Sequence, residues 1–392
     1  MTPKKAGFIM FGAPRIGRAE IREVADTLKG GWIGTGPRTA RFERDFAAYV
    51  GANYAVAVTS GTAALHLALV AGGIGPGDEV VTTPLTFVAT ANAIVSAGAR
   101  PVFADIDRVT QNMDPEAVAR AVGRRTRAIL PVHLAGRPCE MRELVALAKR
   151  RRLLVIEDSS HAIEAVYRGR HAGTIGDFGC FSFTHNKNIT TGEGGAVTTG
   201  RAGIARSLRQ YASQGMTANA WQRYRHRGFQ DYRIMGPGFK YSMPDLNAAI
   251  GLHQLARIGV WWKRRREIWD YYADRFRGLP LIIPSPEVPE GRHALHLFTV
   301  HLDLDRLRYG RDGIRGMLAE RGIGTGVHYI SLHLHPHYRK RYGFSPGDFP
   351  NARWISERTL SLPFSAFLTD SEVERVADVF RAVINSALKS GA

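Results

Sequence analysis

With 392 residues, of which 44% are hydrophobic and 22% are charged, the chain is long enough for one large and one smaller domain. Its two cysteines, Cys139 and Cys180, offer no disulfide framework, and no apolar run approaches the roughly 20 residues that span a bilayer, so we expect a cytoplasmic protein without a membrane partner. The net charge of +18 comes from dispersed arginines without aromatic-interleaved basic patches or zinc-finger spacing, so we expect an Arg-rich surface rather than a nucleic-acid partner.

Strand-like and helix-like patterns alternate over the first 200 residues, which is typical of an α/β fold with a largely parallel sheet. The first helix is expected over Glu20–Lys29, where apolar residues share one face before Gly30-Gly31. A long helix is expected over Pro244–Arg277, and we place the start of a smaller α+β domain near residue 260. Between these helices we expect strands at 54–59, 79–82, 101–104, 128–132 and 153–156, and helices at 62–71, 90–97, 115–122 and 141–151.

The first candidate site lies in the segment 59–65, where an apolar strand ends in a turn that opens a helix. A helix N-terminus presents free N–H groups and the positive end of a dipole, and Gly61 and Thr62 allow close approach and add a hydroxyl donor. This arrangement suits a phosphate, and an ordinary N-cap by Ser60 is the alternative. Because neither the P-loop nor the dinucleotide pattern fits, a nucleoside triphosphate or NAD is not the expected phosphate.

Two further strand ends carry suitable side chains. Phe87 follows the second strand, where it is either core filler or an aromatic plate for a flat ring. The apolar residues Val155 and Ile156 run directly into the acids Glu157 and Asp158, at the carboxyl end of a strand, where ligands bind in open α/β sheets. A buried aspartate needs a partner that offsets its desolvation. A protonated pyridine nitrogen, an arginine or a helix cap would each serve.

Lys187 lies between the aromatic run 181–183 and the glycine-rich segment 192–195, with no other lysine or arginine from residue 171 to residue 200. Removal from water lowers the pKa of a lysine and makes it a nucleophile or a Schiff-base former. A solvated loop lysine is the alternative on these residues alone. A phosphate-binding turn, an aromatic plate, a strand-end aspartate and an isolated lysine together match the requirements of pyridoxal 5′-phosphate (PLP).

Over almost its whole length the chain resembles the DegT/DnrJ group of nucleotide-sugar aminotransferases, which are fold-type-I PLP enzymes. The resemblance runs from the segment 31–37 to the segment 356–363, and its most specific part is Phe181-Ser182-Phe183 followed by residues 187–195. It implies a large domain, residues 1–260, with a mostly parallel central sheet flanked by helices, which binds the cofactor and includes an N-terminal substrate-contacting segment. Residues 261–392 would form the small α+β domain.

The resemblance also implies a role for each candidate residue. Lys187 would hold the cofactor as a Schiff base and then shuttle the proton, and Asp158 would keep the pyridinium nitrogen protonated. Phe87 would stack on the ring, and His161 would lie near its phenolic oxygen. The remaining assignments are the phosphate ligands Gly61, Thr62 and Ser182, the residue Lys240 that would reach the phosphate of a neighbouring subunit in a homodimer, and the substrate-binding residues Trp32, Thr35, His328 and Tyr329.

The run 327–338 contains three alternating histidines, His333, His335 and His337, which a strand would turn to one face as a metal site requires. Pro336 interrupts such a strand, and no cysteine or carboxylate lies at ligand spacing nearby. We therefore expect no metal, and the resemblance assigns this stretch to the sugar-nucleotide pocket.

Relatives with histidine at the position of Lys187 resemble dehydratases, so the lysine favours transamination. The expected reaction moves an amino group from L-glutamate to a keto group of a nucleotide-diphosphate sugar. The segment 188–195 looks like that of relatives that act at C4 of a 4-keto-6-deoxyhexose. The alternatives are a C3-keto-sugar aminotransferase and a non-catalytic regulatory or binding protein with the same fold.

Overall fold

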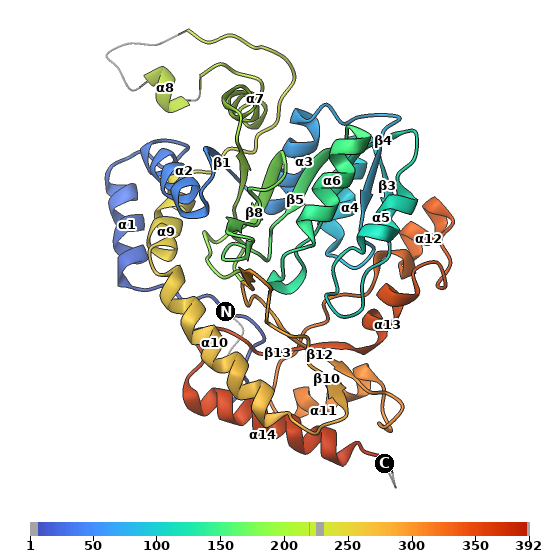
Figure 1. The fold of residues 1–392 in the computed structure, drawn as a ribbon. Helices are drawn as coiled ribbons and strands as arrows, with labels where there is room; N and C mark the ends of the chain where they lie inside the picture. The colour runs from blue at the N-terminus through green and yellow to red at the C-terminus, as the bar shows by residue number, and fades with distance from the viewer. Residues whose placement is uncertain (1–6, 219, 225–230, 390–392) are drawn as a thin grey trace.

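The computed structural model describes residues 7–218, 220–224 and 231–389, and it contains a large and a small sheet-based part (Figure 1). The large sheet has seven strands in the order β1-β9-β8-β5-β4-β2-β3. The pairs β2–β3, β2–β4, β4–β5 and β5–β8 are parallel, and β9 is antiparallel to both β8 and β1. The strands are β1 Tyr54–Val58, β2 Glu79–Thr82, β3 Arg100–Phe103, β4 Thr126–Leu130, β5 Leu154–Asp158, β8 Phe178–Ser182 and β9 Gly195–Thr199.

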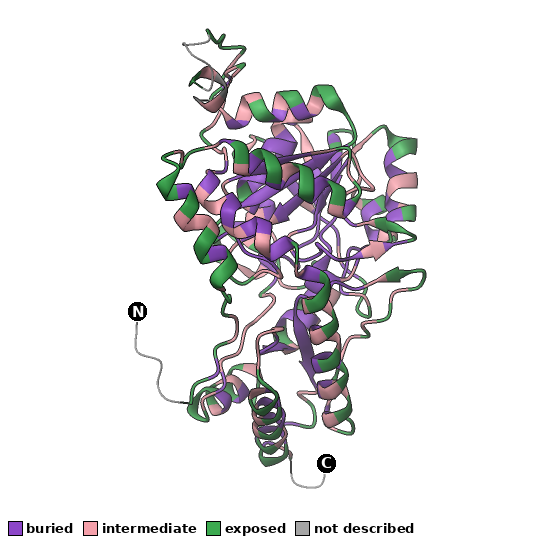
Figure 2. Cartoon of the chain, turned by 90° about the vertical axis from the view of Figure 1, so that its left-hand side faces the viewer, coloured by how far each residue is buried: buried purple, intermediate pink, exposed green. Residues whose placement is uncertain are grey.

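Helices cover both faces of this sheet, and the strands form the buried interior in Figure 2. One set of strand side chains packs on α3, α4 and α7, and the alternate set packs on α2, α5, α6 and α9. A sheet buried on both faces explains why its strands are almost continuously apolar. The helices are α1 Arg18–Lys29, α2 Pro37–Val50, α3 Gly61–Ala71, α4 Val88–Ser96, α5 Pro115–Ala121, α6 Met141–Arg151, α7 Ala202–Ala212, α8 Ala220–Tyr224 and α9 Asp245–Leu255.

The small part is built on the antiparallel sheet β10-β12-β13, which packs on α10, α11 and α14. Its elements are α10 Ile258–Arg275, β10 Leu281–Ile282, β12 Phe298–Leu302, α11 Arg311–Glu320, α13 Pro350–Arg358, β13 Thr359–Leu362 and α14 Asp370–Ser386. The N-terminal segment joins this part, because Ile9 forms a parallel bridge with Ile323 and lies in the same apolar core. The short elements β6 Val166–Tyr167, β7 Arg170–His171 and β11 Gly291–Arg292 form a third sheet.

The long helix expected over Pro244–Arg277 is wrong, because the structure has two helices there. Helix α9 ends at Leu255, and α10 begins at Ile258. The first lies in the core of the large part, whereas the second runs down to the small sheet (Figure 1). The chain must change direction between α9 and α10 because the two helices pack against different parts of the protein. The apolar periodicity of the segment predicts helices but does not predict this change of direction. We propose residue 260, within the first turn of α10, as the domain boundary.

The run with three alternating histidines is not a strand. Residues Leu332–Leu334 form a 3-10 turn, η2, and Pro336–Tyr342 form α12, so the three rings do not share one strand face. A second 3-10 turn, η1, covers Leu134–Gly136. None of the helices in the ranges that the structure describes combines the length and apolar character needed to cross a bilayer.

Candidate active site

The carboxyl ends of β1, β2, β5 and β8 meet at one edge of the large sheet, because β1 and β8 both run antiparallel to β9 and therefore point the same way. At this edge lies a cavity of about 360 Å³. It brings together nine of the residues expected from the sequence, drawn from segments far apart in the chain: Gly61, Thr62, Phe87, Asp158, His161, Ser182, Lys187, His328 and Tyr329.

The turn before α3 is shaped for close approach of a ligand. Ser60 caps the helix, with its hydroxyl oxygen accepting a hydrogen bond from the backbone N–H of Ala63 at 3.1 Å. A β-carbon at position 61 would lie 2.8 Å from the β-carbon of Ser182, so only glycine fits between this turn and β8. The N–H groups of Gly61 and Thr62 lie in the first turn of the helix and have no partner within it. This geometry fits a phosphate group.

Asp158 is buried, with 5% of its surface exposed, and its carboxylate accepts only neutral donors. The backbone N–H of Ser160 donates to Oδ1 at 3.1 Å, and the hydroxyl of Thr90 donates to Oδ2 at 2.9 Å. Thr90 in turn contacts the hydroxyl of Thr86 at 2.8 Å. No lysine, arginine or histidine of the described ranges lies within 4.0 Å of this carboxylate. A buried carboxylate without a close cation fits the protonated ring nitrogen of PLP.

Lys187 follows a tight turn after β8, in which its backbone N–H donates to the carbonyl oxygen of Thr184 at 3.0 Å. Burial lowers the pKa of its amine from 10.5 to about 8, and the negative charge of Asp158 opposes this shift. A lysine with a pKa near 8 has a substantial neutral fraction close to neutral pH, which both nucleophilic attack and proton abstraction require.

Aromatic rings from both parts of the chain line the cavity, and the ring of His296 packs against one of them. The ring of His161 contacts that of His296 at a tilt of 36°, with centroids 4.4 Å apart, and Nε2 of His161 lies 3.1 Å from the hydroxyl of Tyr329. His328 contacts the hydroxyl of Ser361 at 2.7 Å and stacks on Phe11 of the N-terminal segment. The Phe87 ring is 56% exposed, and its centroid lies 6.0 Å from that of Tyr329. Phe87 is therefore an accessible face of the cavity and not core filler.

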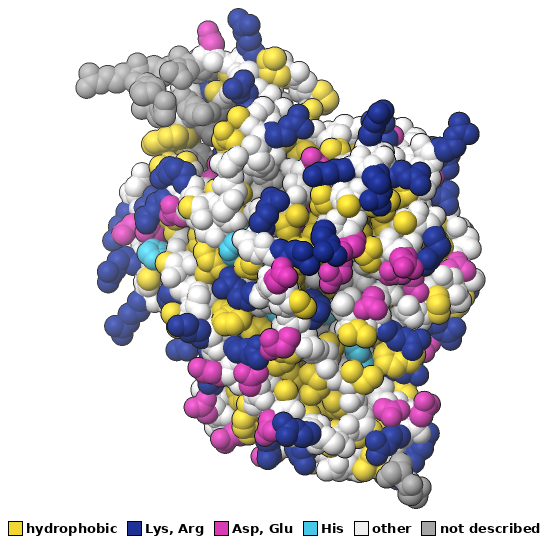
Figure 3. Space-filling view, viewed as in Figure 1, with side chains coloured by type: hydrophobic (Ala, Val, Ile, Leu, Met, Phe, Trp, Pro, Cys, Tyr) yellow, Lys and Arg dark blue, Asp and Glu magenta, His cyan; other side chains and the backbone are white. Residues whose placement is uncertain are grey.

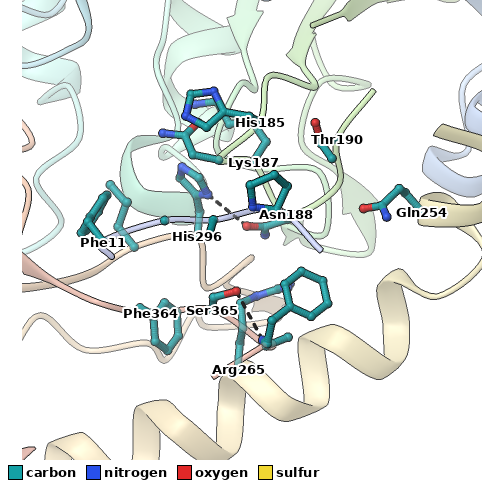
Figure 4. A pocket seen from close by; sticks show the side chains of 17 residues that line it. Phe11, His185, Lys187, Asn188, Thr190, Gln254, Arg265, His296, Phe364 and Ser365 are labelled. Atoms are coloured by element: carbon teal, nitrogen blue, oxygen red, sulfur yellow. Dashed lines mark hydrogen bonds between the residues drawn. The ribbon is translucent and has the colours of Figure 1, made fainter. Parts of the chain in front are cut away.

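A second, smaller pocket of about 40 Å³ lies on another side of Lys187, between the large part and the N-terminal segment (Figure 4). Phe11 lines it from the N-terminal segment, and Arg265 lines it from α10. Arg265 forms a buried ion pair with Glu164. The side chain of Asn188 connects this pair to His296, and a dashed line in Figure 4 marks its contact with the ring of His296.

Three of the expected residues lie away from the cavity of this chain. Lys240 is exposed, and its backbone bridges Ser213 beside α7. The indole N–H of Trp32 donates to the carbonyl oxygen of Thr35 at 3.2 Å, and the Thr35 hydroxyl donates to the carbonyl oxygen of Met243 at 2.8 Å. Thus Trp32 and Thr35 lie beside the segment that follows Lys240, outside the cavity that this chain forms.

The sequence interpretation missed Thr90, Asn188 and His296. Thr90 had a detectable signal, because it is a hydroxyl residue at the start of the expected helix 90–97, directly after the strand end that carries Phe87. Asn188 follows the lysine directly, but its residue type alone carries no signal. His296 lies more than 100 residues from Lys187, and only the fold brings the two together.

Comparisons with known proteins agree with this geometry. A family model described as the DegT/DnrJ/EryC1/StrS aminotransferase family matches residues 14–381. The chain is 45% identical over 388 residues to the spore coat polysaccharide biosynthesis protein SpsC of Bacillus subtilis (strain 168), covering 99% of this chain and 100% of SpsC.

Solved structures are similar over almost the whole chain. The putative sugar aminotransferase Spr1654 of Streptococcus pneumoniae, in its PLP form, superposes with a TM-score of 0.90 at 32% identity, covering 97% of this chain and 100% of that one. The aminotransferase TlmJ of Streptoalloteichus hindustanus gives a TM-score of 0.88 at 35% identity, with coverage of 97% and 100%. The expected fold, a large domain with a mostly parallel sheet and a smaller α+β part, is confirmed.

Proposed function

Because the chain belongs to the DegT/DnrJ/EryC1/StrS aminotransferase family, whose cofactor is PLP, we propose that it transfers an amino group from L-glutamate to a keto group of a nucleotide-diphosphate sugar. The observation that carries this proposal is that one cavity contains both Lys187 and a buried Asp158 whose carboxylate has no lysine, arginine or histidine of the described residues within 4.0 Å. A regulatory or binding protein would need neither group.

The residues of the cavity divide the work of holding the cofactor. Lys187 would attach it covalently, and the carboxylate of Asp158 would keep its ring nitrogen protonated. Phe87 would cover one ring face, and His161 would lie beside the phenolic oxygen. When bound, PLP supplies an electron sink for the carbanion formed at the substrate carbon. Its phosphate would bind at the start of α3 and β8, to Gly61, Thr62 and Ser182.

During the transfer, Lys187 as the neutral amine would remove the proton from the α-carbon of the donor and later return a proton to the acceptor carbon. A pKa of about 8 supports both steps, because the amine can then change between two forms near neutral pH. The neutral form removes a proton, and the protonated form returns one. His328 and Tyr329, from the small part, would contact the sugar.

We propose C4 of a 4-keto-6-deoxyhexose as the position that receives the amine, on the likeness of residues 188–195 to relatives that act there. The name of SpsC, a polysaccharide biosynthesis protein, supports a sugar as the substrate class. Two free cysteines support a cytoplasmic location.

We also propose a homodimer in which Lys240 completes the site of the neighbouring subunit. The exposed position of Lys240, away from the cavity of its own chain, supports this arrangement. The segment 238–245, which contains Lys240, lies beside Trp32 and Thr35. Lys240, Trp32 and Thr35 would therefore reach the neighbouring cavity from one surface.

Absorbance tests the reaction. Protein purified with PLP should be yellow, L-glutamate should shift its visible band, and the Lys187→Ala variant should be colourless. A wild-type protein that never binds PLP would falsify the proposal. Incubation with L-glutamate and a series of keto-sugar nucleotides, followed by mass spectrometry and NMR of the product, identifies the sugar and separates C4 from C3 amination.

A further inference from the structure

Two buried histidines, His161 just after β5 and His296 from the segment before β12, lie against each other with their ring planes tilted by 36°, and His161 lines the cavity. Burial is the main cause that lowers the pKa of each ring well below the usual value, and the positive charge of Lys187 lowers both further. Both rings are therefore neutral near pH 7. A neutral imidazole has one N–H and one lone pair, so the partner of one nitrogen decides what the other nitrogen offers.

The tautomer of His161 follows from the backbone. The N–H of Ala135 donates to Nδ1 of His161 at 3.3 Å, and a backbone N–H has no other role than donor. Nδ1 therefore holds the lone pair, and the hydrogen is on Nε2. That nitrogen lies 3.1 Å from the hydroxyl of Tyr329, which accepts the hydrogen bond. The hydroxyl hydrogen of Tyr329 is then free to point into the cavity that the residue lines.

The tautomer of His296 follows from Asn188. The amide nitrogen of Asn188 lies 2.7 Å from a carboxylate oxygen of Glu164 and 3.0 Å from the carbonyl oxygen of Ala294. The carbonyl only accepts, so the NH₂ group must face this way, and the amide oxygen faces Nδ1 of His296 at 3.0 Å. Nδ1 therefore carries the hydrogen, and Nε2 of His296 holds the lone pair. No hydrogen bond to this Nε2 is found among the residues that the structure describes.

We propose that Asn188 and the backbone of Ala135 fix His296 and His161 in opposite neutral tautomers, so that the site presents the Tyr329 hydroxyl as a donor and His296 Nε2 as an acceptor beside Lys187. Asn188 is then a positioning residue, which acts through His296. Its own orientation is held by the buried ion pair of Glu164 with Arg265.

The location of Lys187 supports the second half of this proposal. Lys187 and His296 both line the pocket of about 40 Å³ shown in Figure 4. The charge of Asp158 acts on Lys187, and the charge of Lys187 acts in turn on the rings of His161, His296 and His328. In the proposed arrangement, an acceptor at His296 Nε2 would stabilise the ammonium form of the lysine, in the same direction as the Asp158 carboxylate. The Tyr329 donor serves an oxygen atom of the cofactor or substrate.

Neutron diffraction from a deuterated crystal at pH 7 tests the tautomers directly. Deuterium is expected on Nδ1 of His296 and on Nε2 of His161. Deuterium on the opposite nitrogen of either ring, or on both nitrogens of one ring, overturns the proposal. This measurement needs no variant and does not depend on which sugar is the substrate.

The Asn188→Ala variant tests the consequence for Lys187. Without the amide, His296 is free to carry its hydrogen on Nε2, and the ammonium form of the lysine loses an acceptor. The pKa of Lys187, taken from the pH dependence of the rate at which the apoprotein binds PLP, should fall by about one unit. An unchanged or raised pKa overturns the acceptor role of His296.

Asn247→Ala is the matched control. The amide of Asn247 donates to the carbonyl oxygens of Thr191 and Glu193 in the loop that follows Lys187, and among the described residues it has no hydrogen bond with a histidine. In the Asn247→Ala variant, the pKa of Lys187 should equal that in the wild type. An equal fall of this pKa in the Asn188→Ala and Asn247→Ala variants would mean that a loosened loop, and not the tautomer of His296, is the cause. This second test rests on the proposed role of Lys187. A wild type that never binds PLP refutes that role and leaves the diffraction result standing.

Discussion

At the residue scale, Asp158 offers a sharp test of how the cavity holds its cofactor. Asp158→Asn keeps the shape of the side chain but removes its charge, so the proposed bond to a protonated ring nitrogen would be lost. Affinity of the apoprotein for PLP, measured by absorbance titration, should fall by roughly 10-fold to 100-fold.

The control for this substitution is Asp177→Asn. Asp177 accepts the backbone N–H of Val155 at 2.9 Å, near the amino end of β5 and away from the cavity. It loses a comparable charge-assisted bond, so its affinity for PLP should match that of the wild type. Equal affinity of Asp158→Asn and the wild type would remove Asp158 from the site.

The lowered pKa of Lys187 predicts a pH dependence of stability. Between pH 8 and 10.5 the unfolded state still binds the proton of Lys187, whereas the folded state has released it. Stability therefore rises with pH over this window, because the cost of burying the ammonium group disappears. Apoprotein Lys187→Met lacks this cost, so it should be more stable than the wild type at pH 7, and its advantage should shrink between pH 8 and 10.5.

Urea unfolding of both proteins at pH 7, 8.5 and 10 measures this difference, and the subtraction cancels every other titrating group. An advantage of Lys187→Met that stays constant or grows with pH contradicts a lysine whose pKa is lowered by burial.

Gly61, Phe87, Asp158 and Ser182 lie at or shortly after the end of an apolar strand, which made them visible in the sequence, whereas His328 and Tyr329 came from the family resemblance. Asp158 stands out in the sequence because it is a charged residue at the end of a buried strand. Lys187 stands out because no other lysine or arginine occurs from residue 171 to residue 200. Asn188 and His296 carry equally specific hydrogen bonds, but their residue types are ordinary in their segments. Their hydrogen bonds form only because the fold brings the segment before β12 close to the loop that contains Lys187.

At the element scale, local patterns located the strands and helices of the large sheet well. The bounds of β2 and α6 agree with the sequence prediction, and β5 continues two residues further, to Asp158. The break between α9 and α10 was missed, because both halves have helical periodicity and the break depends on which layer each half packs against. Hydrophobic periodicity predicts that a helix is present better than it predicts where the chain changes direction between two helices.

The start of α3 predicts a second substitution effect. Gly61→Ala would place a β-carbon 2.8 Å from that of Ser182, so the helix must move away from β8. We expect the apoprotein to lose about 1–3 kcal/mol of unfolding free energy. We also expect weaker binding of PLP, because the N–H groups of this turn move. Denaturant unfolding and absorbance titration measure the two effects.

Gly203→Ala is the comparison for this change. Gly203 lies in the first turn of α7, and a β-carbon there meets no atom within 4 Å. Its unfolding free energy should stay within about 0.5 kcal/mol of the wild type or rise slightly. A Gly61→Ala protein as stable as the Gly203→Ala protein would show that β8 tolerates the shift.

At the scale of the whole molecule, the positive charge is spread and not concentrated. Figure 3 shows Lys and Arg side chains over the visible face with Asp and Glu between them. Many arginines are paired on the surface, as in the contacts of Arg266 with Asp270 and Glu287. This distribution supports an Arg-rich surface and agrees with an anionic small substrate more than with a nucleic acid.

The position of Lys240 outside the cavity of its own chain predicts how activity depends on the pairing of two chains. In one chain Lys240 is exposed and outside the cavity that contains Lys187. If Lys240 serves the neighbouring subunit, Lys187→Ala and Lys240→Ala homodimers each lose activity, and a heterodimer has one site with both defects and one site with neither. After unfolding and refolding an equal mixture, random pairing should restore about a quarter of the wild-type activity. If Lys240 acts within its own chain, every site of the heterodimer keeps one defect, and no activity returns. Refolding each variant alone is the control, since neither should gain activity without the other.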